Sequence, residues 1–478
     1  MNKQYKLKTI ALTVGTVFSL MSTGSALSAA STADTANAFT ASTAATAASV
    51  NAKFTDVVTA VNDNAGLTDT NTADIAALQA VSSTTNAVTI PVDCSSRTLQ
   101  DAIDNTGSVN ELTLNVTGTC TADVDVSRNL ILTGTGNIVG SVRVTHSRLQ
   151  LGIDIDGSGS AGPALLIESG AVASLKGVTV SDTTDTVYVN GGSLVLQGGN
   201  TLTSTSSAAD DATLIVSAGK VLLTGSDSGP GIADTITSTG TSTYAVELET
   251  GSSFVQNFDV SGDAVITGNV DVFGNSSMQL VSATVTATEV GVFMNSSLDL
   301  VHESTTLPTG QTVADVAITT TNFNTGSNSS VLLEDENTNV AEGAFLIATH
   351  FRMDTGSVMT LEGSEPEVEV TGTFKVYASG IFMLGGSVLD SSTSTLNEIG
   401  MNSVFVVDSA SSASTIFSSD SDFDGANGAT WNNEGELFVF FGAQYNDFTG
   451  SALTGEITCG GGTATASIVT NLCEIAGD

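Results

Sequence analysis

One short pattern recurs along this 478-residue chain and constrains its fold more than any other feature. One or two small turn residues precede an apolar-rich triplet, in copies that begin at Ser147, Gly192, Gly219, Ser276, Ser296, Ser329, Gly356, Ser379, Asn402 and Gly435. From Leu194 to Leu437 the copies follow one another after 20 to 33 residues, except between Val221 and Met278, where the gap leaves room for one more. A period of this length is typical of a solenoid, in which like units stack on one another.

Each unit reads as short β-strands. Apolar and polar residues alternate from Leu112 to Val116 and from Glu367 to Val370. A short alternating strand cannot bury its apolar face alone, so equivalent faces must stack along an axis, at about 4.8 Å per rung. One rung of a three-sided helix needs about this much chain. We therefore predict an all-β fold, a single-stranded right-handed parallel β-helix over residues 88–478, with about sixteen rungs at that spacing.

Asparagine precedes several of the predicted strands, at Asn275, Asn295 and Asn328. Asn tolerates the left-handed backbone conformation that a sharp bend requires, so these residues predict turns between faces. The same tripeptides, and Asn115-Val116-Thr117, also match the N-glycosylation acceptor pattern. Such matches arise by chance in a chain rich in Ser and Thr, and we favour the turn interpretation.

The first thirty residues have the pattern of a secretory signal peptide. Lys3, Lys6 and Lys8 precede an uncharged, mostly apolar run over 10–21, and small residues follow. Cleavage after Ala26, Ser28 or Ala30 fits equally well. The apolar run is shorter than the ~20 residues of a membrane-spanning helix, and no later run is longer. We expect an exported protein without a membrane span, extracellular or at the cell surface, with the periplasm as the alternative.

The charge excludes some partners. Fifty acidic residues against twelve basic ones give a net charge of −38, and loss of the signal peptide would remove three lysines and no carboxylate. Nucleic acid is a poor partner, because a protein needs Lys and Arg to displace the counterions of a phosphate backbone. Divalent cations remain plausible partners.

Residues 31–87 differ from the rest, being rich in Ala and Thr and poor in Gly. Ala47, Val50, Phe54, Val57 and Val61 are spaced as on one face of a helix. A helical segment that packs on the solenoid, projects as a stalk or brings copies together is one interpretation, and a flexible leader is the other.

The start of the predicted solenoid, residues 92–157, resembles the pectin-lyase-like right-handed β-helix superfamily. The stretch from Thr98 to Asp104 resembles the amphipathic cap over the first rung, and Leu130-Ile131-Leu132-Thr133-Gly134 resembles a following rung with its turn. The resemblance implies a fold rather than an activity, because lyases, hydrolases, adhesins and phage spikes share these features. It is closest in character to the adhesin-like, non-catalytic members.

Four cysteines in an exported chain predict two disulfides. Cys94 and Cys120 are separated by about one rung near the first end, and Cys459 and Cys473 lie near the other. Of the three pairings, only Cys94 with Cys120 and Cys459 with Cys473 avoids joining opposite ends of a long solenoid. The bonds would hold the two ends, where edge strands are otherwise exposed.

Catalytic chemistry has one candidate location. Arg97, Arg128, Arg143 and Arg148 fall close together in the sequence, with His146 among them and Asp154 and Asp156 nearby. A lyase needs a basic residue beside a uronate, and a hydrolase needs paired carboxylates. No further signature of either accompanies these residues, and His302 and His350 stand alone in the sequence. We predict no catalytic and no cofactor-binding residue.

Asp420, Asp422 and Asp424, followed by Gly425, resemble the start of a calcium loop. An EF-hand would place Glu at position 431, where Trp431 stands, so other rungs or backbone carbonyls would have to complete the six to eight oxygens that Ca²⁺ takes. A weak Ca²⁺ site is one interpretation and a solvated acidic turn is the other.

Two function classes follow. The first is an exported cell-surface or secreted structural, adhesin-like protein without catalytic activity, whose partners would be glycans or other cell-surface components. The alternative is a polysaccharide lyase or glycoside hydrolase that acts on acidic glycans. We favour the first because the repeat is degenerate along its whole length and no cluster of chemically active residues dominates.

Overall fold

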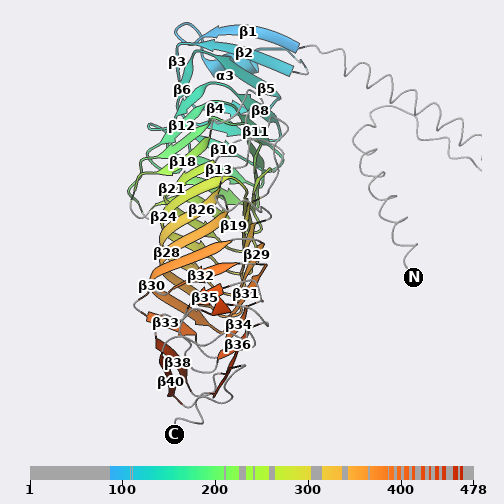
Figure 1. Ribbon diagram of the computed structural model, residues 1–478. Helices are drawn as coiled ribbons and strands as arrows, with labels where there is room; N and C mark the ends of the chain where they lie inside the picture. The colour runs from blue at the N-terminus through green and yellow to red at the C-terminus, as the bar shows by residue number, and fades with distance from the viewer. Residues whose placement is uncertain are drawn as a thin grey trace, which may run out of the picture. The chain divides into compact units, whose positions relative to one another are not determined.

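Successive rungs of parallel strands make up the part of the chain that the structure, a computed structural model, describes (Figure 1). It describes residues 87–394, with gaps at 108, 110, 209–210, 225–232, 241–242, 258–263, 303–314, 336–342, 364–365, 386 and 392–393, and beyond Ser394 the backbone of strands alone. The chain divides into two units, 1–85 and 86–478. The predictions of a signal peptide and of a helical leader lie outside the described residues, Ala87 excepted.

Two large sheets run the length of the described solenoid, and all their strand pairs are parallel. We call the 17-stranded sheet sheet A and the 22-stranded sheet sheet B. Sheet A contains β1 (Ala87–Asp93), β2 (Glu111–Thr117), β5 (Leu130–Gly134), β8 (Arg148–Leu151), β11 (Val172–Leu175), β14 (Ser193–Leu196), β17 (Lys220–Leu223), β20 (Ser253–Gln256), β23 (Ser277–Leu280), β25 (Ser297–His302), β27 (Ser330–Asp335), β29 (Val358–Gly363), β31 (Gly380–Leu384), β34 (Ser403–Val407), β36 (Ser421–Gly425), β39 (Gln444–Asp447) and β41 (Thr463–Ala466).

Sheet B covers the other two sides. It contains β3 (Thr119–Thr121), β4 (Val124–Val126), β6 (Asn137–Val139), β7 (Val142–Val144), β9 (Asp154–Asp156), β10 (Leu165–Ile167), β12 (Thr179–Asp182), β13 (Val187–Asn190), β15 (Thr201–Ser204), β16 (Ala212–Ser217), β18 (Asp234–Ser238), β19 (Tyr244–Glu249), β21 (Ala264–Thr267), β22 (Asn269–Val272), β24 (Ala283–Val292), β26 (Val316–Thr325), β28 (Ala344–Asp354), β30 (Glu367–Tyr377), β32 (Val388–Asp390), β33 (Leu396–Ile399), β35 (Ser412–Ser414) and β37 (Thr430–Trp431). Two further strands, β38 (Glu436–Phe440) and β40 (Glu456–Gly460), pair with each other. The parallel β-helix predicted from the repeat is confirmed.

The repeat corresponds to rungs of sheet A, except for its last predicted copy, which begins at Gly435 and has its apolar triplet in β38 of the separate strand pair. Leu194 is in register with Val221, and Met278 with Leu298. The long gap between Val221 and Met278 holds one more copy, whose Phe254 is in register with both neighbours. Sequence periodicity missed this rung because Ser253-Phe254-Val255-Gln256 ends in a polar residue. Gln256 is nevertheless buried, and its amide bonds the backbone of Val281 and Ser282.

Alternation within each strand separates core from surface as predicted. Leu280 and Leu300 are completely buried. Gln279 and Asp299, which directly precede them in β23 and β25, lie on the outward side of sheet A. Aliphatic side chains from each rung thus form one continuous core. Burial at about 25 cal/mol per Å² makes this column the main stabilising contribution.

The turns before the sheet A strands use asparagine and serine. Asn275, Asn295 and Asn328 have φ of 66°, 60° and 62°, so the turn interpretation is confirmed. Each is followed by a buried serine, and the hydroxyl of Ser296 accepts a hydrogen bond of 3.1 Å from the backbone N–H of Ser276. The hydroxyls satisfy backbone groups that the bend removes from the strand ladder.

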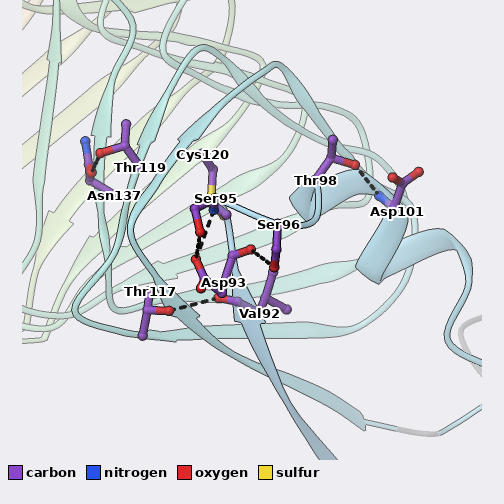
Figure 2. Close-up of a disulfide and its surroundings, with 11 residues drawn as sticks. Val92, Asp93, Ser95, Ser96, Thr98, Asp101, Thr117, Thr119, Cys120 and Asn137 are labelled. Atoms are coloured by element: carbon purple, nitrogen blue, oxygen red, sulfur yellow. Dashed lines mark hydrogen bonds between the residues drawn. A yellow bond between two sulfur atoms is a disulfide. The ribbon is translucent and has the colours of Figure 1, made fainter.

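A short helix and a disulfide cover the first rungs (Figure 2). Helix α3 (Leu99–Asp104) begins at Thr98, whose hydroxyl accepts from the backbone N–H of Asp101 at 3.1 Å. Leu99, Ala102 and Ile103 face the core. Cys94 and Cys120 form a disulfide across a separation of 26 residues, which is the pairing predicted from spacing. Cys459 lies in β40 and Cys473 lies outside the described residues, so their pairing stays a prediction.

Candidate binding face

The basic residues that are close in sequence are not brought together by the fold. Arg128 lies under the end of α3, where its guanidinium donates to four backbone carbonyls, those of Ile103, Thr106, Gly107 and Val109, at 2.8 to 3.4 Å. These carbonyls are the acceptors that a helix end and the loop after it leave without partners. Arg128 therefore holds the cap in place.

Arg143 is on sheet B and forms an ion pair of 2.9 Å with Glu168, which raises the pKa of Arg143. Asp154 accepts from the backbone N–H of Thr179 at 2.7 Å, and Asp156 from that of Ser158 at 3.0 Å. Hydrogen bonds from Ser158 also lower the pKa of Asp156. Each of these carboxylates thus already accepts a backbone hydrogen bond. Both residues lie on sheet B, whereas Arg148 lies on sheet A.

Arg148 stands on the outward side of sheet A, at the edge of a shallow groove of about 370 Å³. The groove crosses five rungs, and its polar wall is formed by Glu111, Asn129, Arg148, Gln150, Ser174 and Gln197. Ile131 and Val172 give it apolar patches. Such a surface offers an extended polymer one cation, several hydrogen-bonding amides and apolar contact.

Charge is segregated along the outward side of sheet A from β5 to β31. In the first part, from β5 to β23, the outward positions carry Arg148, Lys176 and Lys220 and no carboxylate; we call this the basic half. From β25 to β31 they carry Asp299, Glu334 and Glu362 and no cation; we call this the acidic half. We refer to the two halves together as the sheet A face.

The basic half is unusual in a chain with a net charge of −38. Within the described residues, Arg148, Lys176 and Lys220 have no ion-pair partner, although Arg143 and Arg352 each have one. Lys176 extends the ladder of its strand by one hydrogen bond, from its N–H to the carbonyl of Leu151 at 3.2 Å, so its backbone is held in the sheet. These cations are displayed to solvent from a fixed scaffold.

The middle of the sheet A face is largely apolar. Val195, Leu222, Val255, Leu332 and Phe382 occupy the central outward position of their strands, and all are partly buried. Asp299 occupies the same position in β25. Burial raises the pKa of Asp299, and no hydrogen bond within the described residues offsets that burial. The apolar side chains form a discontinuous strip, which we call the apolar strip, because Gln150, Ser174, Gln279 and Thr360 also occupy the central outward position of their strands.

Sheet B carries a second constellation that sequence reasoning missed. Asp271, in β22, has a buried Oδ1 without a hydrogen-bond partner. Burial, followed by the nearby charge of Glu289 and a smaller effect of Glu249, raises the pKa of Asp271 to about 6. A Cβ added at Gly291 would lie 2.9 Å from this oxygen and 2.6 Å from the ring of Phe293, so both approach the glycine closely. The three acids are far apart in sequence, and only stacking brings them near one another.

The fold gives His302 a partner that its isolated position in the sequence does not show. His302, which stands alone in the sequence, lies in the core beside Asp335, with 3.0 Å between Nδ1 and the carboxylate Oδ1. Both side chains are almost fully buried, His302 at 0% and Asp335 at 1% exposure. Their strands, β25 and β27, are neighbours in sheet A and place the two residues at the same register position. The separation of 33 residues hides the pair from any local motif.

The metal prediction is only partly within the described residues. Asp420 lies outside them, while Asp422 and Asp424 lie in β36, in register with Val404 and Val406 of β34. The Ca²⁺ site therefore stays a prediction. Elsewhere in the described part of the chain, no group of three His, Cys, Asp or Glu side chains is arranged to hold a metal ion.

In comparisons with known proteins, no family model, no curated protein and no solved structure matches the chain. Across the described residues, none of the helices combines the length and the apolar character needed to cross a bilayer.

Proposed function

We propose that this is an exported, cell-surface or secreted structural protein of adhesin type, which acts through the sheet A face and not through catalysis. The observation that carries the proposal is the face itself. It extends over many rungs and presents apolar side chains at its centre together with three cations that have no ion-pair partner among the described residues. A face of this kind suits many weak contacts with an extended partner such as a glycan chain.

The disulfide supports export, because disulfides persist mainly in oxidising compartments. The signal-peptide pattern at 1–30 supports it independently. We assign the chain to the pectin-lyase-like superfamily on the resemblance of the capped first rungs. That assignment is part of the proposal, since the parallel β-helix by itself is a fold shared by proteins of many functions.

One observation favours an enzyme as the second candidate. Asp271, whose pKa is raised to about 6, lies near the carboxylates of Glu249 and Glu289. A glycoside hydrolase needs one carboxyl group that is protonated, to act as the acid, near another that is ionised. A raised pKa suits Asp271 to the role of the acid. In this second candidate Asp271 is the acid and Glu289 the base or nucleophile.

The deciding experiment incubates the purified protein with polygalacturonate and alginate, with and without Ca²⁺. Ultraviolet absorbance detects the unsaturated product of a lyase, and reducing-sugar release detects either class of enzyme. We expect neither signal. A signal that vanishes in Asp271→Asn would establish the hydrolase, and one that vanishes in Arg148→Ala would establish a lyase at the groove.

A positive test of the first candidate uses a glycan array. We expect wild-type protein to bind at least one class of glycan, Arg148→Ala to bind it more weakly, and Lys375→Ala, a change on sheet B, to bind it as wild type does. Equal binding by all three would remove the sheet A face from the proposal.

A further inference from the structure

The arrangement of charge on the sheet A face is self-complementary. Its basic half precedes its acidic half along the helix axis, and the apolar strip runs through both. Reversing the face end for end therefore brings each half opposite its complement. We propose that two copies of the chain pair face to face and antiparallel through sheet A, so that the basic half of each covers the acidic half of the other. This inference rests on the proposed function only in that sheet A is the contact face.

The order of strands defines which residues would meet. Starting at β11, the order in sheet A is β11, β14, β17, β20, β23, β25, β27 and β29. A twofold axis parallel to the strands, between β20 and β23, places β11 opposite β29 and β17 opposite β25. Lys176 then lies opposite Glu362. Lys220 lies opposite Ser297, and the carboxylate of Asp299, two residues or about 7 Å further along that strand, is within reach of the long lysine side chain. Because such an interface is isologous, each of these pairs occurs twice.

Alternative placements lose this match. If the two copies were parallel and in register, each rung would face itself, so that the basic half would lie against the basic half and the acidic half against the acidic half. Like charges in direct opposition are unfavourable, and the net charge of −38 already repels two copies at a distance. Of the face-to-face arrangements, the antiparallel one alone sets local attraction against that repulsion.

The centre of the face is suited to close approach. Ser253 and Val255 of β20, with Ser277 and Gln279 of β23, would lie at the twofold axis. These side chains are short or flexible, so two sheets can pack there at about 10 Å. Leu222 and Leu332, on either side, would bury apolar surface that is now partly exposed.

Asp299 supports the arrangement. Its carboxylate is partly buried on the outward side of the sheet, and burial alone accounts for the rise in its pKa. In the paired state Lys220 of the second copy would supply the cation that this carboxylate lacks within the described chain. A buried charge that gains a partner becomes less costly.

The available area predicts a modest affinity. The eight strands from β11 to β29 span about 34 Å at 4.8 Å per strand, and five residues of each span about 16 Å. The face is then about 550 Å² per copy, or about 1,100 Å² in total. This is just above the ~1,000 Å² that a specific interface needs, so pairing should depend on protein concentration.

Sedimentation velocity of the purified chain over a hundredfold range of concentration tests the pairing. We expect a monomer–dimer equilibrium whose dissociation constant rises at least tenfold in the double variant Lys176→Glu/Lys220→Glu. Lys375→Glu is the control for the single variants Lys176→Glu and Lys220→Glu, because it makes the same charge change as either of them, but on sheet B. It should leave the equilibrium unchanged.

Mixing two variants decides the geometry. Lys176→Glu/Lys220→Glu makes both members of each proposed ion pair acidic, and Asp299→Lys/Glu362→Lys makes both members basic. Neither should pair with itself, and an equimolar mixture should form a heterodimer. A wild-type monomer at every concentration, an equal effect of Lys375→Glu, or a mixture that stays monomeric would overturn the proposal. A monomer that still binds a glycan through Arg148 would overturn the pairing and leave the proposed function standing.

Discussion

The described solenoid changes its construction at β24. We call the rungs before β24 the first half and those from β24 to β30 the second half, and the two build the same three-sided rung in different ways. In the first half the second and third sides are separate short strands, such as β12 and β13 or β15 and β16. From β24 to β30 they are one strand of 10 or 11 residues, as in β24, β26, β28 and β30, and after β30 they are separate again, as in β32 and β33 (Figure 1). The corner between those two sides is therefore a break in the ladder in one half and a bend within it in the other.

The cores of the halves differ accordingly. At these corners of the first half, buried polar groups replace the missing ladder bonds, as where the hydroxyls of Thr186 and Ser204 donate to the backbone carbonyls of Thr203 and Thr184 at 2.9 and 2.7 Å. In the second half, Phe323, Phe351 and Phe374 stack on one another, with ring centroids 5.4 and 5.2 Å apart. A broken ladder must be satisfied by side chains, whereas a continuous one leaves the interior free for large apolar rings.

The largest effect is expected from a charge in the core. Leu300→Asp places a carboxylate without a partner among completely buried side chains. The cost of several kcal/mol should unfold the adjacent rungs of the second half. Hydrogen exchange should show protection lost around β23 to β27 and retained around β8 to β14. The neighbouring change Asp299→Asn, on the outward side, is the control. If Leu300→Asp melts like the parent, the strand register is reversed.

Truncation of the aromatic stack should be the next largest. Phe351→Ala removes the ring that contacts both Phe323 and Phe374. We expect a loss of about 3 to 5 kcal/mol, the usual cost of such a cavity, measured by denaturant unfolding. Phe351→Leu should cost less because it refills part of the space. Equal losses in both variants would mean that the stacking of the rings, and not the filled volume, stabilises this half.

The disulfide should matter at one end only. Cys94→Ser/Cys120→Ser opens a loop of 26 residues and should cost about 3 kcal/mol in the chain-entropy model. Because rungs contact only their neighbours, faster hydrogen exchange should be confined to β1, β2 and α3. Loss of protection in the second half as well would show that the two halves unfold as one unit.

The smallest effect concerns Asp271, at the junction of the halves. Its pKa of about 6 in the folded protein lies above the ordinary 3.8, so the folded state binds the proton more tightly. The stabilisation is complete below pH 4 and is lost as the pH rises towards 6. Asp271→Asn should therefore be more stable than the parent at pH 7, by about 1 to 2 kcal/mol after allowance for solvent screening, and should lack this pH dependence. Parallel stability curves for the two proteins between pH 4 and 7 would contradict the raised pKa.

Much of this architecture could be read from local sequence. The alternation around Leu280 and Leu300, the asparagine turns and the N-cap at Thr98 are each specified within a few residues, because strand periodicity, left-handed backbone and capping are local properties. The repeat of small residues and apolar triplets then determined the parallel β-helix, since strands of that length have no other means of burying one face. The spacing of Cys94 and Cys120 determined that they could meet.

Other features were decided only when the rungs stacked. Ser253 to Gln256 forms a rung because the backbone around Val281 satisfies Gln256, and His302 finds Asp335 in the next strand of sheet A. Segregation of charge on the sheet A face depends on which residues point outward in each of many rungs, and the raised pKa of Asp271 depends on carboxylates brought near it by neighbouring strands. Rung lengths vary from 18 residues, between Leu112 and Leu130, to 33, between Val221 and Phe254, so no fixed sequence distance identifies these neighbours. Contacts along the helix axis belong to the tertiary structure alone.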